Sequence, residues 1–171
     1  MTTYFRPNYL WIPLIMLTFS GYAQSTSSTN LQITPQELEI ALGDWTGSLT
    51  YIDYQSNKPY TMPANLEVKP GKNSRELILH RIYPNEPKAN GKGKIKISED
   101  GLMLNKEAVV AKEVLTDGIK IITEYSGKDN NQKAQIRNTY ILQARSLVIR
   151  KEVQFEDSED WLKRSEFTHT K

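Results

Sequence analysis

Residues 107–126, EAVVAKEVLTDGIKIITEYS, decide the fold class. Two β-rich runs, 107–115 and 119–126, lie on either side of Asp117-Gly118. Because successive side chains of a strand point to opposite faces, the second run has one face that consists of Ile119, Ile121, Thr123 and Tyr125. Asp-Gly between two such runs is typical of a tight hairpin. The stretch therefore predicts two antiparallel strands that are consecutive in the chain.

The same pattern continues in both directions from this hairpin. Turn-forming residues separate the runs, and 84–91 is a longer loop with two prolines. The full set of expected strands is 45–55, 60–69, 74–83, 92–98, 102–105, 107–115, 119–126, 134–143, 146–155 and 161–169. Eight to ten strands joined in order predict a mostly β fold, a single antiparallel up-and-down barrel with few exposed edges. A sandwich of two sheets is the alternative.

A short helix is expected directly before the first strand. Thr34 is placed as the N-cap, Pro35 as the first helical residue and Glu37 as the partner in a capping box. Ile33 and Leu38 have the spacing of a hydrophobic staple. With Gly43 as its stop, the helix would have about two turns.

The N-terminal region has the pattern of a signal peptide. An apolar run over 10–19 is too short for a membrane span, and Gly21 and Ala23 are small residues suited to cleavage before Gln24. We therefore predict a signal peptide at 1–23, a flexible polar leader at 24–32 and the barrel domain at 33–171. Removing 23 of the 171 residues leaves 148, which suffices for one domain. The expected product is exported, periplasmic or secreted, and is free of the membrane once the signal is removed.

Charge and cysteine content narrow the classes of function. The chain has 22 Lys and Arg against 20 Asp and Glu, so its charge favours neither nucleic acid nor an anionic membrane as a partner. Lys92, Lys94 and Lys96 would face water from one strand, with no aromatic residues between them for base stacking. The sequence contains no cysteine, which excludes disulfides, thiol catalysis and thiolate metal sites.

Five residues at the start of the first strand resemble a family signature. Gly43-Asp44-Trp45-Thr46-Gly47 is similar to the G-x-W-x-G motif of lipocalins and related calycin barrels. The resemblance implies that Trp45 closes one end of the barrel and that an arginine of the last strand packs across it. Arg164 is the matching candidate.

Alternation along the strands indicates which side chains line the barrel interior. Tyr51, Tyr125, Asn138 and Tyr140 lie on otherwise apolar faces, and they are the expected polar groups of a ligand pocket. The alternative is a solid core. Two registers are open for 74–83, because a shift of one residue exchanges its faces. In one register Arg81 is inside, as a buried cation that requires a carboxylate partner. In the other register His80 is inside.

The sequence patterns lead to three hypotheses of function. The first is non-covalent binding of a small, largely apolar molecule or acid, with Arg81 among the ligand residues. The second is a filled barrel that acts through its surface. The third is an enzyme, or a haem-binding barrel similar to nitrobindin. Resemblance to nitrobindin implies a histidine ligand near the C-terminus. His169 lies there, in a segment that is expected to fray. We predict no cofactor, no metal and no catalytic residue, and the sequence does not determine the oligomeric state.

Overall fold

The structure is a computed structural model that describes residue 1 and residues 30–171. The predicted signal peptide and most of the predicted leader lie outside these residues. Among the described residues, no helix is long and apolar enough to cross a membrane.

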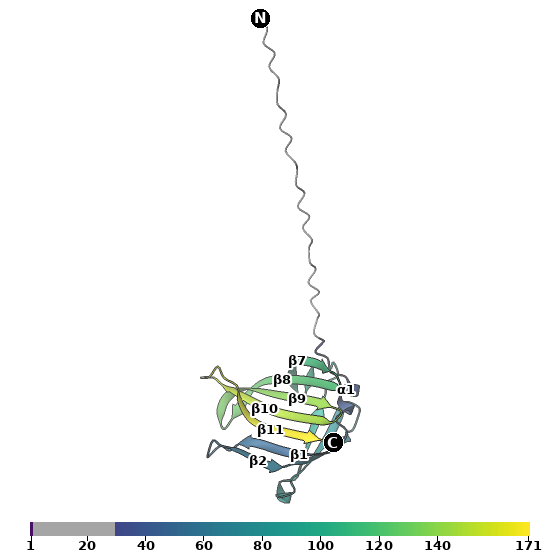
Figure 1. The fold of residues 1–171 in the computed structure, drawn as a ribbon, viewed down its shortest axis with the longest axis vertical. Helices are drawn as coiled ribbons and strands as arrows, with labels where there is room; N and C mark the ends of the chain where they lie inside the picture. The colour runs from purple at the N-terminus through teal and green to yellow at the C-terminus, as the bar shows by residue number, and fades with distance from the viewer. Residues whose placement is uncertain (2–29) are drawn as a thin grey trace.

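The described chain is mostly β-strand, with one short helix before the strands (Figure 1). The helical elements are α1 (Pro35–Glu39) and a single 3-10 turn, η1 (Pro87–Ala89). The strands are β1 (Gly43–Ile52), β2 (Pro59–Pro63), β3 (Asn65–Pro70), β4 (Glu76–Ile82), β5 (Gly91–Lys96), β6 (Met103–Leu104), β7 (Glu107–Leu115), β8 (Gly118–Asp129), β9 (Gln132–Gln143), β10 (Ser146–Phe155) and β11 (Leu162–Thr170).

The strands form one antiparallel sheet that curls into an up-and-down barrel, which confirms the predicted fold class. The strand order is β5-β4-β3-β1-β11-β10-β9-β8-β7-β6, and β2 pairs with the second half of β1. A bridge between Ile97 and Leu104 brings the two ends of the sheet together, so the barrel is nearly closed. The two-sheet alternative is therefore wrong.

Several boundaries differ from the prediction, and three of the differences change how the elements are divided or joined. The expected strand 60–69 is divided at Ala64 into β2 and β3, which pair with different halves of β1. The helix ends at Glu39, well before Gly43. Strands β8 and β9 extend through the predicted loop 127–131, because Asn130 and Asn131 both take positive φ and make a two-residue turn.

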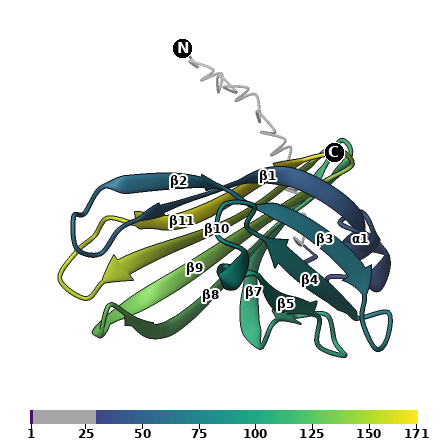
Figure 2. The ribbon, with the colours of Figure 1, turned by 90° about the horizontal axis from the view of Figure 1, so that it is seen from below.

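Figure 2 shows α1 at one end of the barrel. The main hydrophobic core includes residues of the helix region and of the strands at this end. Leu38, Ala41 and Trp45 are each at most 2% exposed, and they belong to the same buried cluster as Leu142 and Leu147 of the barrel wall. The predicted staple residue Ile33 is buried in the same cluster. The helix therefore acts as a plug at this end.

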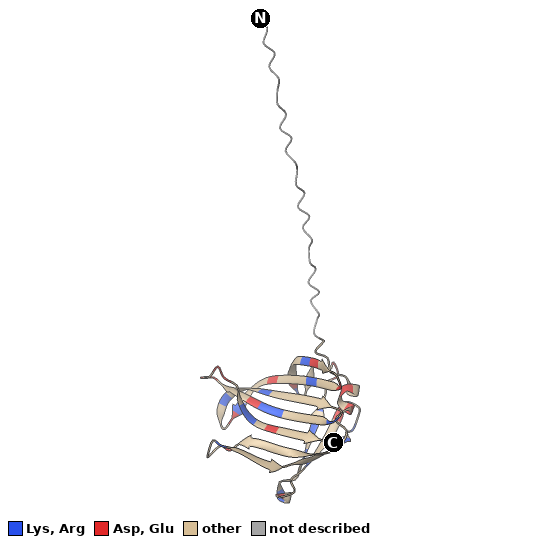
Figure 3. Cartoon of the chain, viewed as in Figure 1, with Lys and Arg blue, Asp and Glu red and all other residues tan. Residues whose placement is uncertain are grey.

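The outer face of strands β8–β11 carries ion pairs between neighbouring strands, and Figure 3 shows acidic and basic positions side by side there. Arg137 of β9 binds Glu124 of β8 at 2.6 Å, and Arg150 of β10 binds Glu166 of β11. These partly exposed contacts place the polar face of the strands outside, so the alternating residues face the interior.

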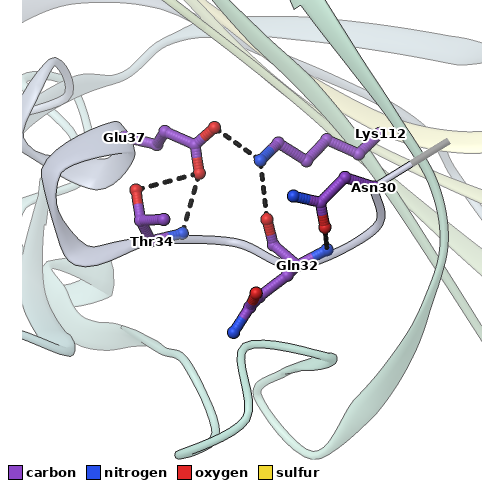
Figure 4. Close-up of polar contacts among 5 residues, drawn as sticks. All are labelled: Asn30, Gln32, Thr34, Glu37 and Lys112. Atoms are coloured by element: carbon purple, nitrogen blue, oxygen red, sulfur yellow. Dashed lines mark hydrogen bonds and ion pairs between the residues drawn. The ribbon is translucent and has the colours of Figure 1, made fainter. Parts of the chain in front are cut away.

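The plug is attached to the barrel by Lys112 of β7, whose side chain is only 7% exposed (Figure 4). Its ammonium group binds Glu37 Oε1 at 2.5 Å and the Gln32 carbonyl at 2.6 Å. The other oxygen of Glu37 accepts from the Thr34 amide at 2.7 Å, which confirms the predicted capping box. Burial opposes ionisation of Glu37, but the bonds from Lys112 and Thr34 outweigh it and lower its pKa.

We expect Glu37→Gln to reduce the free energy of unfolding by about 1 kcal/mol or more at neutral pH, because it leaves the Lys112 charge nearly buried without its counter-ion. A lowered carboxyl pKa stabilises the fold above the unfolded pKa of about 4.3, and this contribution is lost as the pH falls through the folded value. Urea unfolding at neutral and acidic pH measures both effects. Glu39→Gln, on the exposed side of the same helix, is the control, and an equal loss in both variants would contradict the account.

Candidate functional site

The inward faces of four neighbouring strands meet on one line across the barrel. Leu49 of β1 pairs with Phe167 of β11, Phe167 with Ile149 of β10, and Ile149 with Tyr140 of β9. Tyr140 is buried, but Leu49, Phe167 and Ile149 are only half-buried. Three of these four inward-facing side chains therefore keep part of their surface accessible.

The register of β4 is the one that puts Arg81 inside. Leu77 and Leu79 are buried, and Arg81 pairs with the buried Leu66. The guanidinium carbon of Arg81 lies 5.4 Å from the centre of the Phe167 ring, on a strand across the interior. His80 faces outward, where its Nδ1 is 3.4 Å from Glu67.

The five predicted ligand residues all belong to inward faces. Tyr51 is half-buried and stacks at a tilt on Tyr60 of β2, with ring centres 5.5 Å apart. Tyr125 is the most exposed of the five, at 37%. The barrel therefore brings Tyr51, Arg81, Tyr125, Asn138 and Tyr140 to one interior, and their role in binding stays a prediction.

Glu107, at the start of β7, is a further acidic group on this interior. Its Oε2 accepts hydrogen bonds from Thr123 Oγ1 at 2.6 Å and Asn138 Nδ2 at 2.9 Å. Burial, followed by the nearby Glu107 charge, raises the pKa of Tyr140 well above its ordinary value. The same two causes raise the pKa of Tyr125. Both phenols are therefore neutral hydrogen-bonding groups at physiological pH.

A second polar group lies at the end of the barrel opposite α1. The Asp129 side chain, 1% exposed, accepts from Lys151 Nζ and Arg164 Nε at 2.7 Å each and from the Tyr54 hydroxyl at 2.9 Å. Burial opposes ionisation of Asp129, but these three hydrogen bonds lower its pKa overall. We call these four residues the rim network. It ties the ends of β1, β8, β10 and β11 together.

The position of Arg164 corrects the expectation drawn from the family motif. It stacks on Tyr54 at 4.6 Å within the rim network, at the opposite end from Trp45. The pairing of β10 with β11 shifts register at this point, so that Arg164 is a bulged residue without a partner on β10. The bulge turns its side chain to the interior. Lys171 takes the expected place: its Nζ lies 4.3 Å from the Trp45 ring centre and donates to the Leu42 carbonyl at 2.9 Å.

The glycines and tryptophan of the motif have structural roles at the plugged end. Trp45 is 2% exposed and donates from Nε1 to the Ala41 carbonyl at 2.8 Å. Gly43 has φ +112°, which L side chains rarely adopt. A Cβ at Gly47 would lie 2.1 Å from the Thr168 carbonyl oxygen of β11. The motif thus allows β1 and β11 to approach closely beside the plug.

His169 faces the interior from a paired part of the chain, because β11 is paired on both sides up to Thr170, in contrast to the expected frayed segment. It is 2% exposed and stacks on Phe167, with ring centres 5.9 Å apart. Its Nδ1 is buried without a hydrogen-bond partner among the described residues. Burial lowers the pKa of His169, and the charge of Arg81 acts in the same direction.

The surface of the barrel has several hollows, and two of them are lined by residues of the barrel strands and their turns. A slot of about 560 Å³ runs along the seam between β5 and β6, lined by Ile97, Met103, Asn105 and the lysines Lys94, Lys96 and Lys106. A groove of about 530 Å³ lies beside the β8–β9 and β10–β11 turns, between Ser126 and Glu159. Within residues 30–171, no three His, Asp or Glu side chains gather as a metal site would require.

Sequence reasoning missed Glu107, Asp129 and Gly93 as parts of the interior. Glu107 follows Asn105-Lys106, where both residues take positive φ and turn β6 into β7. Recognising Asn130-Asn131 as a similar tight turn would have extended the alternation of Tyr125 and Gly127 to Asp129. No pattern in the sequence marks Gly93 of β5, where an added Cβ would lie 2.8 Å from Nη1 of Arg81.

The comparisons with known proteins concern the fold. The crystal structure of Rv2717c from M. tuberculosis matches with a TM-score of 0.54 at 12% identity, over 82% of this chain and 98% of that one. A protein of unknown function from the DUF3598 family of Nostoc punctiforme matches with a TM-score of 0.37 at 10% identity, over 82% of this chain and 49% of that one. No family model and no curated protein matches the chain. The lipocalin resemblance therefore stays a prediction.

Proposed function

We propose that the barrel binds a small, largely apolar molecule non-covalently in its interior. One observation carries this proposal: Leu49, Ile149 and Phe167 face inward from three neighbouring strands and are only half-buried. Apolar side chains that stay accessible inside a barrel gain free energy when a ligand covers them.

The chemistry of the interior supports a ligand with few polar groups. The apolar side chains Leu49, Ile149 and Phe167 lie near a small number of polar ones, among them Tyr51, Asn138 and Arg81. Small-molecule sites commonly combine a mostly apolar wall with a few polar groups that fix orientation. We further propose that the chain acts after export, because the pattern of residues 1–23 is that of a cleaved signal peptide.

Haem does not fit the residues that the third hypothesis requires. An imidazole that bonds iron needs open space beside one ring nitrogen. The His169 ring is 2% exposed, and its Nδ1 is enclosed by protein. We therefore assign no haem to this interior.

We expect Ile149→Trp to weaken binding of octanol at least about tenfold, because the larger side chain occupies the space that the ligand needs. Val148→Trp adds the same ring to the outer face of the same strand and is the matched control. Isothermal titration calorimetry on the chain without its N-terminal 23 residues, with both variants checked for folding by circular dichroism, measures the effect. If wild-type protein binds no octanol, or if Ile149→Trp binds it as well as wild type, the interior is not the site.

A further inference from the structure

Arg81 differs from the other cations of the barrel interior, of which Lys112 pairs with Glu37. Lys151 and Arg164 both pair with Asp129 in the rim network. Arg81 is half-buried, yet it forms no ion pair and no side-chain hydrogen bond with any residue that the structure describes. A guanidinium withdrawn from water is costly unless an anion or acceptor compensates it. The interior therefore contains one positive charge that a ligand could neutralise.

The surroundings of Arg81 hold the guanidinium in place beside the apolar wall. It lies over the Phe167 ring and against Gly93 of β5, where an added Cβ would be 2.8 Å from Nη1 and 3.0 Å from Nη2. The absence of a side chain at Gly93 thus makes the space that the guanidinium occupies. Its planar fork is suited to the two oxygens of a carboxylate.

We propose that the ligand of this barrel is a small apolar carboxylic acid whose carboxylate pairs with Arg81 while its hydrocarbon part covers Leu49, Ile149 and Phe167. This inference rests on the proposed function and names the class of ligand. One unpaired guanidinium balances one negative charge. A carboxylate carries one negative charge and a phosphate monoester about 1.5 to 2 at neutral pH, so a carboxylate is the better match for one guanidinium.

The lysines at the seam between β5 and β6 are a second observation that favours an anionic ligand. Lys94, Lys96 and Lys106 line the slot there, on the same edge of the sheet that carries Gly93. Lys94 pairs with Glu76, whereas Lys96 and Lys106 form no ion pair with the rest of the described chain. A positive field at the protein surface raises the local concentration of anions and their rate of association.

The test compares octanoate with octanol, which share a hydrocarbon chain and differ in charge, in a buffer free of phosphate. We expect wild-type protein to bind octanoate at least about tenfold more tightly than octanol, as a charge-assisted bidentate pair would give. Arg81→Met should remove this preference and keep the affinity for octanol. Arg75→Met makes the same change at an exposed arginine just before β4, and it should keep the preference.

Gly93→Ala is the second variant, and it keeps the charge. Its methyl group forces the guanidinium to move, so the preference for octanoate should fall even if Arg81→Met does not fold. Equal affinities for octanoate and octanol in wild type, or a preference unchanged in both variants, would overturn the role of Arg81 and leave interior binding intact. Tighter binding of octyl phosphate than of octanoate would overturn the carboxylate assignment. Binding of neither octanoate nor octanol would overturn the proposed function as well.

Discussion

Asp129→Asn is expected to lower the free energy of unfolding by about 3 kcal/mol or more. The substitution leaves Lys151 and Arg164, the latter 9% exposed, without the carboxylate that both contact at 2.7 Å. Removing one partner of a buried ion pair is strongly destabilising because the remaining charge stays out of water without compensation. Urea unfolding followed by circular dichroism measures the loss.

The pH dependence of the free energy of unfolding shows whether the ionised Asp129 carboxylate is the cause of this loss. The pKa of Asp129 is lowered in the folded state, so its contribution is complete above the unfolded value of about 3.9 and disappears as the pH falls through the folded one. The difference between wild type and Asp129→Asn should therefore be constant near neutral pH and shrink in acid. Asp157→Asn, in the exposed β10–β11 turn, is the control. A loss for Asp129→Asn no larger than for Asp157→Asn would show that the rim network does not stabilise the barrel.

Gly47→Ala is expected to destabilise the fold by about 3 kcal/mol, or to prevent folding, because the added methyl group meets backbone that cannot move freely. Its Cβ would lie 2.1 Å from the Thr168 carbonyl oxygen and 2.8 Å from His169 Cα. Relief requires β1 and β11 to separate, and their pairing joins the two halves of the sheet. Chemical denaturation gives the change in stability.

Gly91→Ala provides the comparison for Gly47, since both glycines lie in strands. At Gly91 the nearest atom to an added Cβ is the Ala89 carbonyl oxygen at 3.8 Å, so the methyl group has room. This variant should change the free energy of unfolding by less than about 0.5 kcal/mol. If Gly47→Ala were equally harmless, the close approach of β1 and β11 would not explain the glycine of the motif.

Local patterns predicted the fold well, because hairpins and caps depend on residues that are close in the chain. The capping box of Thr34 and Glu37 and the alternation of Ile119, Ile121 and Thr123 are of this kind, and all of them are present in the structure. The register of β4 could not be derived, because both of its faces are apolar and only the pairing with β3 decides between them.

The interior was predicted less completely, because its contacts join residues far apart in the chain. Asp129 meets Tyr54 across 75 positions, and Lys171 reaches the Leu42 carbonyl across 129. The family resemblance pointed to a cation over Trp45, but Arg164 lies near the start of β11, at the opposite end from Trp45, and Lys171 lies over the ring instead. A single inserted residue in a strand cannot be recognised from the alternation of apolar and polar side chains. The insertion nevertheless moves every residue that follows it to the opposite face of the strand.

The central claim, that the interior holds the ligand, is tested most directly by a crystal structure with octanoate that carries a terminal bromine. Anomalous scattering locates the bromine independently of the rest of the ligand density. We predict a peak inside the barrel beside Leu49, Ile149 and Phe167, with the carboxylate at Arg81. A peak confined to the surface groove between Ser126 and Glu159, or no peak at saturating ligand, would contradict interior binding.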